Sequence, residues 1–400
     1  MKILMLVLAY YENDARVRRY AESLHQDGHL VEVIALRGPG KPARETLCGV
    51  EVRRVPMARR RGGMLQTFLE YLFFFFWGFI YISLSALRNK PAIVHIHNMP
   101  DFLVFTALLP RLRGSKIVLD VHDLMPEVFA SKTGLPVVSS LILPLRLEER
   151  LSLGVSDRVI FATEIFRRLA VDRGSTKIED SLAIMNVADP TLFDAKKHPW
   201  TGPEDPNEFR VLYLGTITHR HGVDQIVRVL PLVREAIPGI RFVVHPRLAA
   251  GEGRPLQELE ELAAELGVAD LLRIERALSL EEVPEVMSQA SVGAFTPHQD
   301  VHIDMALSLK VPEFVAMGLP IIAVRTRIME SLFQDGEVLY FEDGELEQFA
   351  RHLIYLHRHP DAARDMAKRA RRFLSEHSWQ QEYQRYGKML EELTGQQIKT

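Results

Sequence analysis

The sequence predicts an α/β protein with two Rossmann-like domains, each built around a parallel sheet. Three observations predict this class. Apolar, β-branched runs of strand length alternate with helix-like segments from residue 2 onward. The chain has 400 residues, which is more than one hydrophobic core usually serves. The alternation pauses at a polar stretch with proline and glycine, residues 195–209, and then restarts, so we place a domain boundary there.

Composition narrows the class of protein. The 47% hydrophobic and 25% charged fractions are those of an ordinary globular protein. A formal net charge of -3 argues against a general affinity for nucleic acid. The single cysteine, Cys48, excludes an intrachain disulfide and fits a reducing cytoplasm. We interpret the apolar run at 2–10 as a first strand and not a signal peptide, because no small-residue cleavage site follows it.

In the first domain the pattern predicts strands followed by helices in turn. The strands are expected at 2–10, 30–36, 50–55, 92–97, 116–122 and 156–163, and the helices at 14–26, 64–88, 101–113 and 135–153. Ligands of such sheets lie beyond the carboxyl ends of the strands, so the residues after each strand are candidates for function. No GxGxxG follows the first strand, which disfavours a dinucleotide-binding oxidoreductase. Asp14 is expected to cap the first helix.

Residues 64–88 form an unusually apolar helix. The stretch from 71 to 87 has no charge and contains four consecutive phenylalanines, and several arginines precede it: Arg53, Arg54, Arg59, Arg60 and Arg61. A membrane span needs about 20 apolar residues, but strands before and after this helix share one sheet, and a bilayer cannot separate them. A buried core helix and an interfacial helix on anionic lipid remain. We favour the interfacial helix, because one face of a sheet cannot cover phenylalanine on every side.

Histidines occur at two strand ends of the first domain. His95 and His97 lie on one face of their strand, but the sequence offers no third ligand at convincing spacing, so a structural role is favoured over a metal pair. His122 ends the next strand and is followed by Asp123 and Glu127. The imidazole could hydrogen-bond a donor-sugar hydroxyl, and the carboxylates could orient an acceptor hydroxyl. The alternative is a helix cap beside a structural histidine.

The most informative stretch is SLKVPEFVAMGLP, residues 308–320, which runs into the strand candidate IIAV. Lys310 and Glu313 are three apart, so both point from one face of a short helix near its N-terminus. The free N–H groups and partial positive charge of that end, together with Lys310, suit a diphosphate. Glu313 could accept hydrogen bonds from two sugar hydroxyls. The alternative is an amphipathic helix whose two charges meet solvent.

The turn after the strand RVLYLG is the second candidate element of this domain. Gly215 allows close backbone approach, and Thr216 follows it. A departing diphosphate gains charge in the transition state, so the site needs positive charge, which we assign jointly to Lys310 and Arg220. The alternative for Arg220 is a solvated loop. The sequence has no Asp-x-Asp pair, so no metal is expected in nucleotide-sugar binding.

The run LSLKVPEFVAMGLPIIAVRT resembles the donor-site signature of retaining glycosyltransferases of family 4, group 1 glycosyltransferases of bacterial surface polysaccharide synthesis, which have the GT-B fold. In that family the lysine and the early helix face the diphosphate of a nucleotide sugar, and the glutamate binds the ribose. The resemblance implies these roles for Lys310 and Glu313. Many members carry a second glutamate where this chain has Met305, which we interpret as a subfamily difference.

Other segments resemble the same family, roughly over residues 1–390. VLDVHDLMPEVF is similar to a segment whose histidine lines the donor-sugar pocket, which implies that role for His122. In the segment around Gly215, Thr216 stands where the family has an arginine and His221 where it has a lysine. The resemblance also places the backbone at Arg276 near the nucleotide base. The tail from residue 378 resembles a helix that crosses back to the first domain.

The resemblance implies an acceptor-side domain at 1–195, a nucleotide-sugar-binding domain at 205–377, and a terminal helix at 378–400, with the two domains facing across a cleft. The implied reaction moves a sugar from a nucleoside diphosphate sugar to a lipid-linked glycan or similar acceptor, without metal, at the cytoplasmic surface of the membrane. Two alternatives remain. One is a sugar-nucleotide epimerase of the same fold, and the other is a catalytically silent membrane adaptor.

Overall fold

The computed structural model describes residues 1–58, 63–247 and 254–396. The chain divides into two compact units, of which the first comprises residues 1–185 and the segment from Gln380 onward, and the second residues 186–379. The expected linker at 195–209 belongs to the second unit. Trp200 Nε1 donates to the Ala290 carbonyl at 2.7 Å, and the backbone N–H of Thr201 donates to the Ser288 carbonyl at 3.0 Å. The division therefore falls earlier than the expected end of the first domain at 195.

The first unit contains an eight-stranded sheet in the order β3-β4-β2-β1-β5-β6-β7-β8. The strands are β1 (Lys2–Val7), β2 (Leu30–Leu36), β3 (Arg44–Leu47), β4 (Val50–Val55), β5 (Ile93–His97), β6 (Lys116–Val121), β7 (Arg158–Phe161) and β8 (Ser181–Ala183). All neighbours are parallel except β3, which pairs antiparallel with β4. The sequence analysis missed β3, because this short edge strand lacks an apolar pattern.

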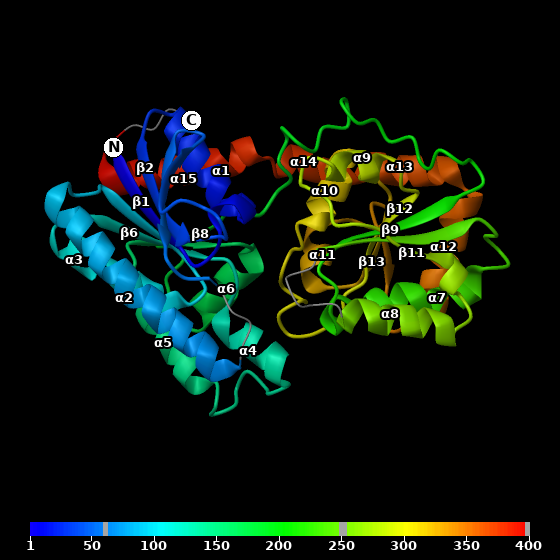
Figure 1. The fold of residues 1–400 in the computed structure, drawn as a ribbon, viewed down its shortest axis with the longest axis horizontal. Helices are drawn as coiled ribbons and strands as arrows, with labels where there is room; N and C mark the ends of the chain where they lie inside the picture. The colour runs from blue at the N-terminus through cyan, green and yellow to red at the C-terminus, as the bar shows by residue number, and fades with distance from the viewer. Residues whose placement is uncertain (59–62, 248–253, 397–400) are drawn as a thin grey trace. The chain divides into compact units, whose positions relative to one another are not determined.

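Helices cover both faces of this sheet. They are η1 (Tyr11–Asn13), α1 (Ala15–Gln26), α2 (Met64–Arg88), η2 (Asp101–Ala107), α3 (Leu108–Leu112), α4 (Met125–Thr133), α5 (Leu143–Val155), α6 (Glu164–Asp172) and α15 (Trp379–Thr394). Figure 1 shows α1 and α15 on one side of the sheet and α2, α3 and α5 on the other. Asp14 caps α1 as expected, accepting from the Val17 N–H at 3.0 Å. The helix expected at 135–153 begins only at Leu143, with Pro144 in its first turn.

The second unit contains a six-stranded parallel sheet in the order β11-β10-β9-β12-β13-β14. The strands are β9 (Phe209–Gly215), β10 (Ile240–Pro246), β11 (Leu272–Ile274), β12 (Val292–Phe295), β13 (Ile321–Val324) and β14 (Leu339–Phe341). The helices are η3 (His219–His221), α7 (Val223–Val233), α8 (Arg254–Glu265), η4 (Ala269–Leu271), α9 (Val283–Ser288), α10 (Lys310–Met317), α11 (Arg327–Leu332), α12 (Leu346–Arg358), α13 (Pro360–Ala370) and α14 (Arg372–Glu376). Two Rossmann-like units therefore confirm the predicted fold class.

Strand order places a ligand site in each unit. The order reverses between β1 and β5 in the first sheet and between β9 and β12 in the second. In open α/β sheets the crevice for a ligand lies at the carboxyl ends of the strands where the order reverses. His122 directly follows β6, beside the first reversal, and Gly215 ends β9 at the second. The fold thus sets these two predicted residues at the expected edges.

Candidate active site

In the second unit, Lys310 and Gly215 meet at the carboxyl end of β9. The Lys310 ammonium lies 4.0 Å from the centroid of the Tyr213 ring, a cation–π contact. Gly215 has φ +117°, and a Cβ built on it would lie 2.9 Å from Lys310 Cε. Only glycine suits this backbone and this closeness. On the neighbouring strand, Gly293 leaves room for the Phe314 ring, which seats α10 against β12.

Lys310 carries the main positive charge of this site. Burial lowers its pKa to about 7, although the carboxylate of Glu313 acts in the opposite direction. Lys310 forms no ion pair with the described residues. Burial and the charges of Lys310 and Arg220 lower the pKa of His221 to about 4, so this imidazole is neutral. The site therefore has an ammonium group that an anion could bind.

The structure separates the two cations that the sequence analysis joined. Arg220 Nε donates to Asp300 at 2.8 Å, and Nη2 lies 2.6 Å from His302 Nδ1. Because Asp300 neutralises the guanidinium, Arg220 is a weaker diphosphate ligand than the sequence analysis expected. Thr216 follows Gly215, is partly exposed, and its carbonyl accepts from the Tyr213 hydroxyl at 2.7 Å.

Two further predicted residues occupy different surroundings. Glu313 is partly exposed in the first turn of α10, on the same short helix as Lys310. The Arg276 side chain is exposed and paired with Glu282 at 3.0 Å, while its carbonyl lies 3.0 Å from His245 Nδ1. Only the backbone of Arg276 is therefore fixed by the fold.

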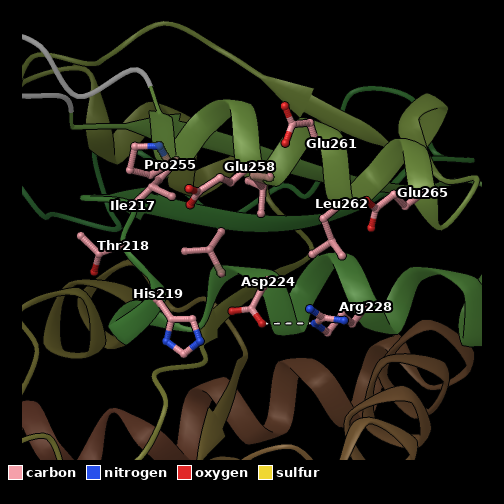
Figure 2. Close-up of a pocket in the computed structure, with 12 residues that line it drawn as sticks. Ile217, Thr218, His219, Asp224, Arg228, Pro255, Glu258, Glu261, Leu262 and Glu265 are labelled. Carbon is pink, nitrogen blue, oxygen red and sulfur yellow. Dashed lines mark hydrogen bonds and ion pairs between the residues drawn. The ribbon is translucent and has the colours of Figure 1, made fainter. Parts of the chain in front are cut away.

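A groove of about 310 Å³ lies between α7 and α8 in the second unit (Figure 2). Thr218 and His219 stand at one end of it. Its other wall carries Glu258, Glu261 and Glu265, which would repel a diphosphate. On charge, the Lys310 site is the better place for a nucleotide diphosphate.

In the first unit, His122 belongs to a buried network centred on Asp120. His122 Nε2 lies 3.1 Å from Asp120 Oδ2, and His97 Nδ1 lies 3.0 Å from the same oxygen. Arg16 donates from Nε to Oδ2 at 2.8 Å and from Nη2 to Oδ1 at 2.6 Å. It also donates to the Ile184 carbonyl at 2.8 Å. This bidentate geometry holds the carboxylate in one orientation.

The charges of this network shift its pKa values in opposite directions. Burial disfavours the charged form of Asp120, but Arg16 and His122 outweigh it and hold the pKa of the carboxyl well below its usual range. Burial alone would lower the pKa of His122, yet the charge of Asp120 raises it. Burial lowers the pKa of His97, so that ring is neutral. His122 is therefore the member of the pair that holds a proton more readily.

Asn98 fixes the backbone at His122. Its Oδ1 accepts from the His122 N–H at 2.7 Å, and its Nδ2 donates to the Asp123 carbonyl and to Asp101 Oδ1, both at 2.7 Å. Asp101 is fully buried, and burial together with the charge of Glu148 raises its pKa well above the ordinary value. Asn98 thus joins the ends of β5 and β6 where His122 emerges.

Sequence reasoning missed Arg16, Asn98 and Asp120 as members of this site. Two signals were present: an aspartate inside the apolar strand KIVLDV, and an asparagine directly after AIVHIH. Both are polar side chains where a buried parallel strand would normally carry apolar ones. Their partners lie far away in sequence, so the pattern alone does not identify the contacts.

The structure corrects the expectation for Glu127. Its side chain is 1% exposed and ion-paired with Arg173, whose Nη1 lies 3.2 Å from its Oε2. A carboxylate committed to an interior ion pair is not available to an acceptor hydroxyl. Asp123 is partly exposed beside His122 and keeps the predicted position.

The structure also corrects the surroundings of His95 and His97. Both are fully buried, and Asp120 supplies a third group within 4.8 Å that spacing in the sequence did not reveal. Arg16 already donates to both oxygens of that carboxylate, so a cation at this position would meet a guanidinium. His95 Nδ1 lies 2.9 Å from the Tyr386 hydroxyl of α15. The cluster therefore serves packing and hydrogen bonding.

Two Rossmann-like units, each with a polar site at a strand reversal, define the GT-B class of fold. Solved structures agree. The chain has a TM-score of 0.79 with sucrose-phosphate synthase from Thermosynechococcus elongatus, at 16% identity over 98% of this chain and 99% of that one. HepE from Anabaena in complex with UDP gives a TM-score of 0.69 at 14% identity, covering 98% and 100%. At such identities the likeness concerns the fold.

Family comparisons cover most of the sequence. A glycosyl transferase 4-like domain matches residues 14–179, and a glycosyl transferase-like domain matches residues 228–387. The chain therefore belongs to the family 4 glycosyltransferases of GT-B fold. Arg16, Asp120 and His122 lie in the first matched range and Lys310 in the second, whereas Gly215 lies in neither.

Curated relatives are similar over parts of the chain. A GDP-mannose-dependent alpha-(1-6)-phosphatidylinositol monomannoside mannosyltransferase of Mycolicibacterium smegmatis is 28% identical over 136 residues, about a third (34%) of each chain. The phosphatidylinositol N-acetylglucosaminyltransferase of Arabidopsis thaliana has a subunit that is 24% identical over 350 residues, which are 86% of this chain and 71% of the relative.

Proposed function

We propose that the protein is a glycosyltransferase that moves a sugar from a nucleoside diphosphate sugar to a hydroxyl of a lipid-linked or glycan acceptor. The observation that carries the proposal is the Lys310 ammonium, which lies over Tyr213, against Gly215, at the first residue of α10. Membership of a glycosyltransferase family supports the same reaction. The names of the two curated relatives specify phosphatidylinositol derivatives, which favours a lipid-linked acceptor.

In this proposal Lys310 and the N–H groups of α10 bind the diphosphate and stabilise the charge that develops when it leaves. Glu313 accepts hydrogen bonds from the ribose hydroxyls. His122, held by Asp120 and Asn98, contacts the transferred sugar. None of these roles requires a metal, and retention of anomeric configuration is proposed from family membership.

The proposal includes a peripheral position on the inner face of the cell membrane, in bacterial polysaccharide or glycoconjugate synthesis. Among the described residues one helix, Leu65–Arg88, is long and apolar enough to cross a membrane, and only 22% of its most apolar window is buried. Its ties to β1 and β2, through Lys2 to Ser85 at 3.0 Å and Tyr81 to Glu32, favour a helix that lies on the surface of the bilayer.

The arginines before α2 contribute less to this contact than expected. Arg54 is buried and paired with Glu12 and Glu45, and Arg53 is paired with Glu32 and Glu51. These charges are neutralised inside the protein. Residues 59–61, the other three arginines, lie outside the described part of the chain.

A thermal-shift panel of UDP, GDP, ADP and CMP tests the donor site. A ligand that binds only the folded state at 100 times its dissociation constant adds about 2.7 kcal/mol of stability. We expect a shift with one nucleotide, lost in Glu313→Ala and retained in Glu347→Ala, which removes an exposed glutamate from α12.

The outcomes separate the candidate functions. A selective shift followed by release of the nucleoside diphosphate only when a lipid-linked acceptor is added supports the transferase. Conversion of the donor sugar without any acceptor would instead identify an epimerase. A protein that binds none of the nucleotides would contradict the proposal and favour a silent adaptor.

A further inference from the structure

Exposed apolar side chains gather in one part of the first unit. Of the 23 large hydrophobic side chains that are exposed among the described residues, 16 lie between residues 65 and 151. They are Leu65, Phe68, Leu69, Phe73, Phe76, Phe79, Ile80, Leu84 and Leu87 on α2, Leu108 and Leu112 on α3, Val138 and Leu141 in the following loop, and Leu143, Leu147 and Leu151 on α5. Monomeric soluble proteins seldom expose so many together.

The exposed face of α2 is a continuous apolar stripe. Its members recur every three or four residues from Leu65 to Leu87, so they line one side of the helix over about 33 Å. The opposite side, at Phe74, Gly78, Ile82 and Ala86, is buried against the rest of the unit. The helix is therefore seated by one face and leaves an apolar face without a protein cover.

A second helix, α5, repeats this arrangement. Leu143, Leu147 and Leu151 are spaced by four residues and are 60%, 56% and 54% exposed. The acidic residues of α5 point inward instead. Glu149 is fully buried and accepts from Ser175 Oγ at 2.7 Å, and burial raises the pKa of Glu148 to about 7. The outer face of α5 is thus apolar, although its sequence contains two glutamates.

The charges around these helices are of one sign. Between residues 71 and 156, all of which the structure describes, no acidic side chain is in the exposed class, whereas six basic ones are: Arg88, Lys90, Arg113, Lys116, Lys132 and Arg150. The chain as a whole has a formal charge of -3, so composition does not explain this surface. An apolar face bordered only by exposed bases matches an anionic lipid surface.

The two helices lie on the same side of the sheet. Both pack against η2, and Figure 1 shows α2 and α5 running alongside each other. Each leads from the carboxyl edge of the sheet to its amino edge, before β5 and β7 respectively. Their exposed apolar faces can therefore meet one flat surface together.

We propose that α5, the loop at 138–141 and the tip of α3 form, with α2, one lipid-binding face that docks on an anionic bilayer. This extends the proposed membrane position, which rested on 64–88 alone, to a second helix. A second copy of the chain fits the face less well, because pairing two such faces would bring exposed bases of like charge together. The inference uses the proposed membrane position but not the proposed catalysis.

Vesicle co-sedimentation at low salt tests the role of α5. The probes are vesicles of phosphatidylcholine and vesicles in which about one third is phosphatidylglycerol. We expect the triple variant Leu143→Ser, Leu147→Ser, Leu151→Ser to lose about tenfold or more in binding to the anionic vesicles, because three partly inserted side chains become polar. The matched control, Leu232→Ser, Leu266→Ser, Leu280→Ser, alters three exposed leucines of the second unit and is expected to bind as the wild type does.

A charge-reversal pair tests the choice of an anionic surface. Arg113→Glu with Lys116→Glu is expected to lower binding to the anionic vesicles about tenfold and to leave the weak binding to phosphatidylcholine unchanged. Lys196→Glu with Lys197→Glu changes two exposed lysines of the second unit and is the matched control. Binding that ignores these changes and added salt would overturn the electrostatic half of the proposal.

Three results would overturn the inference in different ways. If the α5 triple variant binds like the wild type while Phe73→Ser with Phe76→Ser and Ile80→Ser does not, the lipid face is α2 alone. If light scattering finds a lipid-free dimer that the α5 variant dissociates, a second copy covers the face. If the wild type ignores anionic vesicles, the membrane position itself is wrong. The thermal shift with nucleotide, measured in every variant, reports folding and the donor site separately.

Discussion

The two sites of this protein treat charge differently. In the first unit the Asp120 carboxylate is met by Arg16 and by the imidazoles of His97 and His122, so that the buried charges neutralise one another. In the second unit Lys310 has an aromatic ring and a glycine beside it and forms no ion pair with the described residues. The first site is complete by itself, and the second has a positive charge available to a ligand.

This difference indicates a division of labour. A charge paired inside the protein fixes geometry, which suits a residue that must be positioned precisely against a sugar. A partly desolvated ammonium has lost hydration and gains it back as hydrogen bonds when a diphosphate arrives. Five changes, ordered from the largest expected effect to the smallest, each alter one side of the comparison.

Asp120→Ala removes the centre of the paired site and leaves Arg16 buried without its carboxylate. Breaking a buried ion pair from one side costs about 3–5 kcal/mol, and we expect the free energy of unfolding to fall by that amount in a denaturant titration. Asp361→Ala, which removes a carboxylate that is 92% exposed, is expected to leave stability unchanged. A loss below about 1 kcal/mol would show that the network does not hold the first unit together.

His122→Ala leaves Asp120 and Arg16 paired but removes the group that contacts the sugar. We expect turnover to fall about 100-fold or more, with nucleotide affinity unchanged, because the donor is held by the other unit. Steady-state turnover and nucleotide titration measure the two effects separately. His359→Ala, on an exposed histidine that begins α13, serves as the control. Unchanged turnover in His122→Ala would remove this residue from the mechanism.

Lys310→Met removes the unpaired charge of the second site. Nucleotide affinity is expected to fall about 100-fold, the value of a strong charge-assisted hydrogen bond. The melting temperature without ligand should rise, because burial of the ammonium, which lowers its pKa to about 7, opposes folding. Lys368→Met, on the exposed side of α13, should change neither quantity. A variant that binds nucleotide normally would displace the diphosphate from Lys310.

Nucleotide binding should also depend on pH through Lys310. The free site has a pKa of about 7, and a bound diphosphate raises it, so the complex holds more protons than the free protein above pH 7. Affinity is therefore expected to be level below pH 7 and to fall by up to about tenfold per unit above it. Calorimetry in buffers of different ionisation enthalpy measures the proton uptake. Persistence of the same dependence in Lys310→Met would assign it to another group.

Arg276→Ala is expected to have the smallest effect. Its side chain is exposed and paired with Glu282, so only its backbone is available to a nucleotide base. Nucleotide affinity in a titration should stay within about twofold of the wild type, as for removal of an exposed ion pair. A tenfold loss would show that the guanidinium itself contacts the nucleotide.

The fold was largely predictable because its signals are local. Alternating apolar strands and helices specify two parallel sheets, and the N-cap at Asp14 and the helix at 64–88 follow from neighbouring residues. The errors occurred where local signals are weak. Edge strand β3 has no apolar pattern, and the stretch before Pro144 could be joined to α5 by composition alone.

The candidate site divides along the same line. Lys310 and Glu313 lie on one short helix, so their spacing already predicted a shared face. The contact of Lys310 with Gly215 joins residues 95 positions apart, and that of Arg16 with Asp120 joins residues 104 apart. The sequence could propose each of these residues only from its own neighbours or from family resemblance.

By itself, the sequence determined the class of fold, the family, the apolar helix and the residues around Lys310. Periodicity and local spacing suffice for these features, since they act within one helix or strand. The tertiary structure decided that Arg220 and Glu127 are committed to ion pairs, that Asp120 anchors His122, and that α5 turns its leucines outward and its glutamates inward. The physical reason is that pairing and burial of a charge depend on which distant segments surround it, and only folding brings those segments together.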